Sequence, residues 1–102
     1  MDPKREFWKG TYYLLILKMI KESGTSYGYE LRKALKELKP SESTIYDTLK
    51  KLEKGGYVKG EWVKVKGRAR KRYQLTERGE ELLRELEEEA RLLCSFLTGP
   101  RK

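Results

Sequence analysis

Six basic side chains lie within nine positions in the second half of the chain. They are Lys64, Lys66, Arg68, Arg70, Lys71 and Arg72. Lysine and arginine bind phosphate groups, and each such contact with a nucleic acid releases counterions. The segment 57–75 holds seven basic residues and one acidic residue, a net charge of +6, whereas the whole chain carries +8. A charge excess this local is typical of a nucleic-acid-binding surface, although a solvated basic loop would have the same composition.

Several catalytic chemistries are excluded by what the sequence lacks. The chain has no histidine, and Cys94 is its one cysteine. Enzymes that rely on Ser–His, Cys–His or His–metal chemistry are therefore excluded, as are an internal disulfide and a four-ligand zinc site. We expect no enzyme activity, no metal and no cofactor. Cys94 is expected to be an apolar filler or a surface thiol, and a redox role would require a disulfide between two subunits.

The length and composition predict one small folded protein. A chain of 102 residues corresponds to about one domain, and 37% hydrophobic residues are enough to form a core. The longest apolar run covers residues 12–17, far short of the roughly 20 residues that cross a bilayer. The N-terminus lacks the apolar segment of a signal peptide. We therefore expect a cytoplasmic protein that makes no membrane contact.

Apolar spacing predicts a first helix over residues 9–22, with apolar side chains on two faces. One face carries Tyr13, Ile16, Leu17 and Ile20, and the other carries Trp8, Tyr12, Leu15 and Met19. A helix that is apolar on two faces must be covered on both. In so short a chain, the second cover is expected to come from another subunit.

Two more helices are predicted before the basic cluster. The second covers residues 27–38 and ends before Pro40, because the residue before proline is disfavoured in a helix. Its inward residues are Leu31, Ala34, Leu35 and Leu38. The third begins at Ser41 as its N-cap and continues to about Lys54. Its inward residues are Ile45, Leu49 and Leu52, and its other side is polar and cationic.

The remaining chain predicts a hairpin followed by a long helix. Alternating residues over 62–66 and 70–75 indicate two strands, with Gly67, Arg68 and Ala69 at the tip. Thr76 caps a last helix of about twenty residues, which ends near Gly99 and Pro100. Its apolar residues recur every three or four positions: Leu83, Leu86, Ala90, Leu93 and Leu97. This seam fits a dimerisation helix or a helix packed on the core equally well.

The order of three helices, a basic hairpin and a long helix is that of a winged helix-turn-helix protein. The fold class is therefore mainly α with a small β-hairpin. We expect a DNA-binding domain over residues 1–75 and a C-terminal dimerisation helix with a tail over 76–102. In this arrangement the third helix enters the major groove, and the hairpin, called the wing, contacts the flanking backbone.

Three motifs in the same order resemble those of PadR-type transcriptional regulators. Residues 26–31 (SYGYEL) are similar to the family's "hGYEl", residues 43–58 to "gtlYraLkrLeedGlv", and residues 67–79 to "grprKyYrlTekG". The resemblance covers roughly residues 8–90, and the single C-terminal helix resembles the compact subfamily. The family often has proline where this chain has Ala69, so we expect a less rigid wing tip.

The resemblance implies a homodimeric repressor that binds double-stranded DNA. Within the third helix, it implies that Thr44, Tyr46 and Lys50 contact phosphates and the groove wall. Ser43, Asp47 and Lys51 would vary with the operator. The wing would contribute Lys66, Arg68, Arg70, Lys71 and Arg72. For Tyr46, the alternative is a half-buried aromatic ring that braces the helix.

The resemblance also implies that the last helix packs against the first helix of the partner subunit. The expected interface residues are Trp8, Tyr12, Leu15, Met19, Leu83, Leu86, Ala90, Leu93 and Leu97. A space lined by Trp8, Tyr12, Leu82 and Leu86 would receive a small aromatic or cationic effector. The alternative is that these side chains simply fill the interface.

Two other functions are compatible with the same residues. One is an architectural protein that binds nucleic acid with low specificity through the basic wing. The other is a winged helix that binds proteins, although such a module would not need six cations on its hairpin. Preference for one palindrome over random duplex separates the regulator from the architectural protein, and a lack of duplex binding at low salt would favour the protein-binding module.

Overall fold

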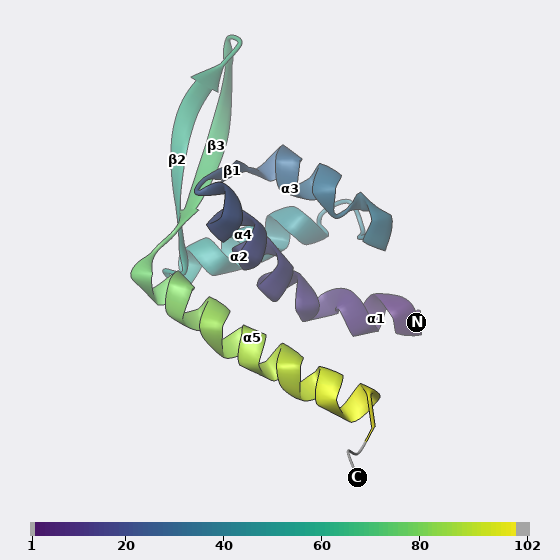
Figure 1. Cartoon of the computed structure of the whole chain (residues 1–102). Coiled ribbons are helices and arrows are strands. Elements are labelled where there is room, and N and C mark those ends of the chain that lie inside the picture. The colour runs from purple at the N-terminus through teal and green to yellow at the C-terminus, as the bar shows by residue number, and fades with distance from the viewer. Residues whose placement is uncertain (1, 100–102) are drawn as a thin grey trace.

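The computed structural model of the chain describes residues 2–99, which form a group of helices from which a small antiparallel sheet projects (Figure 1). The helices are α1 (Pro3–Lys9), α2 (Thr11–Ser23), α3 (Gly28–Ala34), the 3-10 turn η1 (Lys36–Leu38), α4 (Thr44–Lys54) and α5 (Glu77–Leu97). The strands are β1 (Ser26–Tyr27), β2 (Val58–Val65) and β3 (Arg68–Leu75), in the sheet order β1-β3-β2. The predicted fold class, mainly α with a small hairpin, is confirmed.

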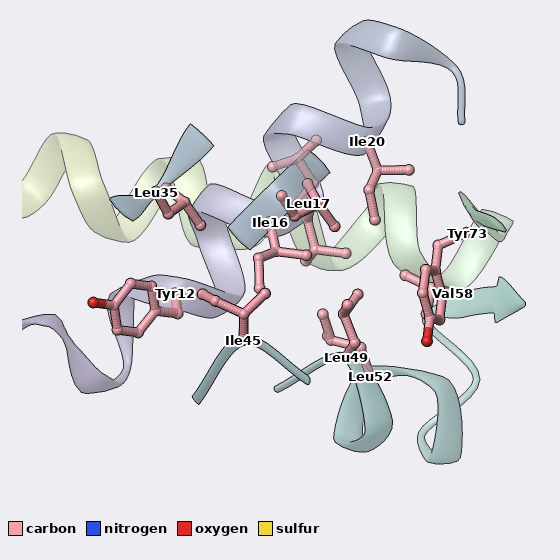
Figure 2. Packing of buried hydrophobic residues seen from close by; sticks show 12 residues of the cluster. Tyr12, Ile16, Leu17, Ile20, Leu35, Ile45, Leu49, Leu52, Val58 and Tyr73 are labelled. Atoms are coloured by element: carbon pink, nitrogen blue, oxygen red, sulfur yellow. The ribbon is translucent and has the colours of Figure 1, made fainter. Parts of the chain in front are cut away.

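The core lies between α2, α4 and the base of the wing (Figure 2). Its fully buried residues on the two helices are Ile16, Leu17, Ile20, Ile45, Leu49 and Leu52. These positions recur at helical spacing, so each helix places its apolar side chains on the face that meets the other. Val58 and Tyr73 close the core from the wing. The inward residues predicted for the third helix are thereby confirmed.

The wing, β2 and β3, is longer and more tightly closed than predicted. Val65 pairs with Arg68, so Lys66 and Gly67 alone form the turn. Both have positive φ, 51° and 79°, as in the type I′ turn that matches the twist of a hairpin. Glycine adopts this conformation readily. The predicted tip was wrong at Arg68 and Ala69, which belong to β3 because a two-residue turn leaves them paired.

The N-terminal helix begins earlier than predicted and is interrupted. Residues 3–9 form α1, which Asp2 caps by accepting a hydrogen bond from the Lys4 backbone N–H at 3.0 Å. Gly10 separates α1 from α2. Because of this interruption, Trp8 and Tyr12 do not share one continuous helical stripe. Tyr12 is only 4% exposed and packs in the core (Figure 2).

The second predicted helix is shorter than expected at both ends. Ser26 and Tyr27 form β1, which pairs with Tyr73 and Arg72 of β3, so α3 begins at Gly28. The helix ends at Ala34, whose side chain is exposed and not inward as predicted. The other residues predicted to face inward, Leu31, Leu35 and Leu38, do contact the core.

The third predicted helix begins three residues after its expected cap. Ser43, not Ser41, stands at the N-cap position of α4, and its side chain makes no capping hydrogen bond. Ser41 belongs to the preceding turn, where its carbonyl accepts from the Thr44 N–H at 3.1 Å and its hydroxyl contacts the Thr44 hydroxyl. The predicted end at Lys54 is confirmed.

Helix α5 starts at the base of the wing, as predicted. The Thr76 hydroxyl oxygen accepts from the Gly79 N–H at 3.1 Å, and the hydroxyl donates to the Gly56 carbonyl at 2.6 Å. The helix passes α2 and ends at Leu97, and the predicted stop at Pro100 lies outside the described residues. No helix within residues 2–99 is long and apolar enough to span a membrane.

Candidate nucleic-acid interface

The predicted DNA-contacting side chains of α4 lie on the face opposite the core. Ser43, Asp47, Lys50 and Lys51 are exposed. Thr44 is half-buried, because its hydroxyl contacts that of Ser41 in the turn before the helix. The exposed face therefore offers hydroxyl, carboxylate and ammonium groups, which are the groups that hydrogen-bond to base edges and phosphates.

Tyr46 makes the bracing contact that was one of the two roles considered for it. Its side chain is 43% exposed, yet its ring lies against Gly28 at the start of α3. A Cβ atom at Gly28 would lie 2.7 Å from Cε1 of that ring, so only glycine permits this contact. The ring thus braces α4 against α3, and the hydroxyl has no hydrogen-bond partner within residues 2–99.

Two of the predicted wing cations form ion pairs with acidic neighbours. Lys71 donates to Glu53 of α4 at 2.8 Å, and this hydrogen bond raises the pKa of Lys71. Arg72 donates across the hairpin to Glu61 at 3.0 Å, which raises the pKa of Arg72. Arg72 and Lys71 lie in the middle of the wing, opposite Glu61 and Trp62. The Lys71 pair joins the wing to α4 and partly neutralises the charge there.

The cations nearer the tip are available for other partners. Lys64, Lys66 and Arg68 are exposed and form no ion pair within the described part of the chain. The guanidinium of Arg70 lies 4.5 Å from the centre of the Tyr29 ring, a cation–π contact, and forms no ion pair within residues 2–99. Tyr29 in turn stacks on Tyr27, with ring centres 5.6 Å apart. The end of the wing therefore holds most of the uncompensated positive charge.

A groove of about 230 Å³ separates the wing from α3 and α4. Its lining residues are Tyr27, Gly28, Tyr29, Tyr46, Trp62, Ala69, Arg70, Lys71 and Tyr73. Lys71 Nζ lies 5.5 Å from the centre of the Trp62 ring and 5.9 Å from that of Tyr73. Burial raises the pKa of Tyr73, which keeps its hydroxyl protonated.

Apart from Tyr46, the aromatic residues of this groove were missed as site residues by sequence reasoning. The signal was present in the interleaving of Trp62 and Tyr73 with the wing cations. Tyr27 and Tyr29 gave no comparable signal, because β1 is too short to show a strand period and only the fold brings it beside β3. The groove adds flat apolar faces to the basic surface, and such faces pack against sugars or bases.

The residues predicted for a dimer interface fall into two groups. Tyr12 and Leu83 are each 4% exposed because both pack in the core of the same chain, so they present almost no surface to a partner. Their assignment to the interface is corrected accordingly. Five others are half-buried: Trp8, Leu15, Met19, Leu86 and Ala90. Leu93 and Leu97 are 45% and 73% exposed.

The exposed apolar surface extends beyond the predicted seam. Phe7, Leu92 and Phe96 are also exposed, with Phe96 at 76%. The seam Leu83, Leu86, Ala90, Leu93 and Leu97 did not include Leu92 or Phe96, because a period of three and four selects one stripe only. Cys94 lies among them and is exposed.

The four residues predicted for an effector site are not brought into one groove of the chain. A groove of about 220 Å³ between the start of α2 and α5 includes Leu86 but not Trp8, Tyr12 or Leu82. Its lining residues are Gly10, Thr11, Leu14, Leu86, Glu89, Ala90 and Leu93. Tyr12 instead packs in the core and lines a different groove, beside α1 and the turn before α4.

Comparison with known proteins assigns this fold to one family. The model of the transcriptional regulator PadR-like family matches residues 16–85, more than half of the chain. A search of curated proteins found no significant match.

Solved structures of transcriptional regulators superpose on the chain. A PadR family transcriptional regulator from Eggerthella lenta is 34% identical, with a TM-score of 0.77 over 91% of this chain and 83% of that one. A PadR-like transcriptional regulator from Bacillus cereus is 28% identical, with a TM-score of 0.79 over 91% and 93%. A transcriptional regulator from Clostridium thermocellum is 27% identical, with a TM-score of 0.80 over 95% and 99%.

The family model and the similar solved structures both agree with the geometry described above, in which an exposed polar helix lies beside a basic wing. This protein belongs to the PadR-like family of transcriptional regulators, whose members bind DNA.

Proposed function

We propose that the protein is a sequence-specific repressor that binds duplex DNA as a homodimer. Residues 1–75 form its DNA-binding part, and residues 76–102 form its dimerisation helix and tail. The observation that carries the proposal is the exposed polar face of α4 beside a wing whose end holds unpaired cations. A dimer bound at a promoter would prevent RNA polymerase from binding there, and this would repress transcription.

The DNA contacts divide between specificity and affinity. Ser43, Asp47 and Lys51 on α4 read base edges, whereas Thr44, Tyr46 and Lys50 dock the helix on the groove wall. The wing supplies phosphate contacts through Lys66, Arg68, Arg70, Lys71 and Arg72. Lys71 and Arg72 must exchange their carboxylate partners for phosphate, so their contribution to affinity is smaller than that of the free cations.

The apolar end of α5 supports the dimer. Four of its apolar side chains are exposed and lie close together: Leu92, Leu93, Phe96 and Leu97. They therefore form an apolar patch, which is more typical of an interaction surface than isolated apolar residues are. A second copy of the chain would cover them with the half-buried residues Trp8, Leu15 and Met19. A two-fold dimer presents two α4 helices to half-sites about one helical turn apart, roughly 34–36 Å.

The start of α5 is fixed to the end of α4, which supports a defined half-site spacing. Thr76 donates its N–H to the Tyr57 carbonyl at 3.2 Å, and Arg78 donates to the Gly55 carbonyl at 2.9 Å. The Arg78 guanidinium also lies 4.7 Å from the centre of the Tyr57 ring. Because the dimerisation helix and the reading helix are joined here, the dimer geometry sets the distance between the two reading helices.

A small-molecule effector would bind at the same dimer surface. The groove beside Leu86, Ala90 and Leu93 is apolar, and Glu89 lies at its rim. These groups suit a flat aromatic cation, which the carboxylate attracts and the apolar walls cover. Titration with a planar cationic dye should quench Trp8 fluorescence saturably in a Trp62→Phe variant. Absence of saturable quenching would mean that the partner's side chains fill the groove.

The function is tested by DNA binding at fixed salt. Fluorescence anisotropy would compare a duplex from the promoter of the protein's own gene with a scrambled duplex of equal length. A specific regulator should prefer the promoter by about 1,000-fold or more. Equal affinity for both duplexes would indicate an architectural protein. No binding to either at low salt would indicate a protein-binding module.

A further inference from the structure

One face of the wing turns toward α4 and borders the groove of about 230 Å³ between the wing, α3 and α4, called here the aromatic groove. Trp62 of β2 lies opposite Lys71 of β3, and Gly60 lies opposite Tyr73. Side chains two positions apart on a strand share a face, so Trp62, Lys71 and Tyr73 lie on the same face of the wing. Lys71 reaches Glu53 of α4 from this face at 2.8 Å. Trp62 therefore lies on the side of the wing that faces the aromatic groove.

Trp62 has a largely exposed indole ring. It is 67% exposed, whereas Tyr46 and Tyr29, which also line the groove, are 43% and 39% exposed. Lys71 Nζ lies 5.5 Å from the centre of the indole ring, and no aromatic ring stacks on it within residues 2–99. A single exposed ring is common on protein surfaces, but this one borders a groove that other rings line. Burial of so large an apolar surface against a partner is favourable.

The charges of the aromatic groove favour a polyanion as that partner. Its lining, all within residues 2–99, includes Arg70 and Lys71 and no acidic residue. Lys71 is paired with Glu53, whereas Arg70 forms no ion pair within the described chain. The groove thus places an unpaired guanidinium beside flat apolar rings. A sugar–phosphate strand has the matching chemistry, because it alternates sugars that have apolar faces with negative phosphates.

The arrangement of the wing and α4 indicates which strand this is. Figure 1 shows the wing projecting from the helices beside α3, with α4 leading into its base. When α4 enters the major groove of DNA, one sugar–phosphate strand forms the wall of that groove on the side of the wing. The wing contacts the backbone beyond α4, so this strand runs between the two elements, where the aromatic groove lies.

We propose that the aromatic groove receives this strand of duplex DNA, with a deoxyribose packed on Trp62 and the adjoining phosphate bound by Arg70. The inference rests on the proposed DNA-binding function and adds to it a contact by Trp62 that involves neither a phosphate nor a base edge. A strand held between the wing and α4 fixes the position of the wing on the DNA.

The first measurement compares DNA affinity and salt dependence among variants of Trp62. Trp62→Ala removes the ring, and we expect binding to the promoter duplex to weaken by about 10-fold for each subunit, as for other aromatic contacts with nucleic acid. The slope of log K against log salt should keep its wild-type value, because no charge is lost. Trp62→Phe keeps a flat ring and should bind within about 3-fold of wild type.

The matched control is Val63→Ala. It shortens an apolar side chain at the next position of β2, which lies on the other face of the wing, so it should bind as wild type. The salt slope also tests an indirect role of the ring. If Trp62 only held Lys71 in place, Trp62→Ala would change the slope by about 0.9 for each lysine affected, and this result would overturn a direct contact.

The second measurement locates the contact by tryptophan fluorescence. The chain has two tryptophans, Trp8 and Trp62. Saturating promoter duplex should protect the emission of the wild-type protein from quenching by acrylamide. This protection should be absent in Trp62→Phe, in which only Trp8 emits. Equal protection in Trp62→Phe would assign the effect to Trp8 and overturn the contact at Trp62.

The failure of this contact and the failure of DNA binding are distinguishable. Wild-type protein that binds no duplex would overturn the proposed function and this inference with it. Wild-type binding with Trp62→Ala equal to Val63→Ala would overturn this inference alone. A single-stranded oligonucleotide of the promoter sequence should bind more weakly and protect Trp62 less than the duplex does. Stronger protection by the single strand would mean that the ring stacks on unpaired bases, and this would overturn the sugar contact.

Discussion

The wing and the last two turns of α5 are both exposed, but their chemistry is opposite. The wing tip carries Lys66 and Arg68, which form no ion pair within residues 2–99. The end of α5 carries Phe96 and Leu97, exposed by 76% and 73%. Water solvates the cations well, and they release counterions only when a polyanion binds. Water solvates the apolar side chains poorly, so they favour burial against another protein.

The two surfaces therefore suit two different partners. Charge at one end favours DNA, and apolar area at the other favours a second copy of the chain. The hydrogen bonds of Thr76 and Arg78 to the segment 55–57 fix the start of α5 beside the end of α4, away from both surfaces. Because the side chains of both surfaces are exposed, a change at one surface should leave folding intact and act on its own partner first.

The largest expected effect comes from reversing charge on the wing. Arg70→Glu with Arg72→Glu should weaken binding to all duplexes by about 1,000-fold at 0.1 M salt, because four charges change sign in a dimer. Anisotropy titrations at several salt concentrations measure both the loss and the slope. The neutral pair Arg70→Gln with Arg72→Gln is the control, since it avoids repulsion by Glu61. Unchanged affinity and slope would show that the wing does not bind phosphate.

The next effect comes from placing charge on the apolar end of α5. Leu93→Arg should give a folded monomer, because Leu93 is 45% exposed and not needed in the core. Loss of the second half-site should reduce DNA affinity by about 100-fold. Light scattering and circular dichroism measure the mass and the fold. Glu81→Arg, exposed on the first half of α5, should remain dimeric; a dimeric Leu93→Arg would place the interface elsewhere.

Sequence periodicity predicted the elements that the core determines. Ile45, Leu49 and Leu52 recur at helical spacing and are buried, and Thr76 caps α5 as its sequence context indicated. Both features can be predicted from residues that are near one another in the sequence. The spacing of apolar residues shows which face of a helix is buried, and the residues at a helix start show its cap. The three motifs in order also predicted the family correctly.

The features that sequence analysis missed depend on distant contacts or short elements. β1 has two residues and exists only because β3 lies beside it. The ion pair of Lys71 with Glu53 joins residues eighteen positions apart, so the strand pattern could not indicate it. Helix α1 was different, because Asp2 followed by Pro3 is a helix-start signal present in the sequence. That signal was overlooked because the apolar stripe begins only at Trp8.

Substitution of Glu53 should have a smaller effect on DNA affinity, and it should strengthen binding where the two changes above weaken it. Glu53→Gln removes the carboxylate that accepts a hydrogen bond from Lys71. In the wild-type protein this hydrogen bond raises the pKa of Lys71. The freed ammonium should strengthen DNA binding by about 3-fold and steepen the salt slope by about 0.9 for each subunit. Chemical denaturation should show a loss of about 0.5 kcal/mol in stability. Weaker binding in this variant would mean that Glu53 positions Lys71 for phosphate.

The smallest effect concerns the ion pair that fastens α5 to α2. Lys18 donates to Glu87 at 2.9 Å, which lowers the pKa of Glu87 below its ordinary value of 4.5. A carboxyl with a lowered folded-state pKa stabilises the fold above its ordinary pKa and loses this contribution as the pH falls through the folded-state value. Lys18→Gln should therefore lower Tm slightly at pH 7, and the difference from wild type should vanish as the pH falls through the folded-state pKa of Glu87.

The control for this measurement is Lys4→Gln, which removes a cation with no ion-pair partner within the described residues. Its Tm should follow wild type at every pH. A Lys18→Gln difference that persists in acid would attribute the effect to packing of the lysine side chain on α5 and not to the charge of Glu87.

The mass of the protein–DNA complex tests the central claim most directly, since it reports on both surfaces at once. Sedimentation of the protein with a palindromic promoter duplex, at saturation and fixed salt, counts the chains on each duplex. The account predicts two chains for wild type and no stable two-chain complex for Leu93→Arg. One chain per duplex with full affinity, or two chains that Leu93→Arg leaves in place, would contradict it.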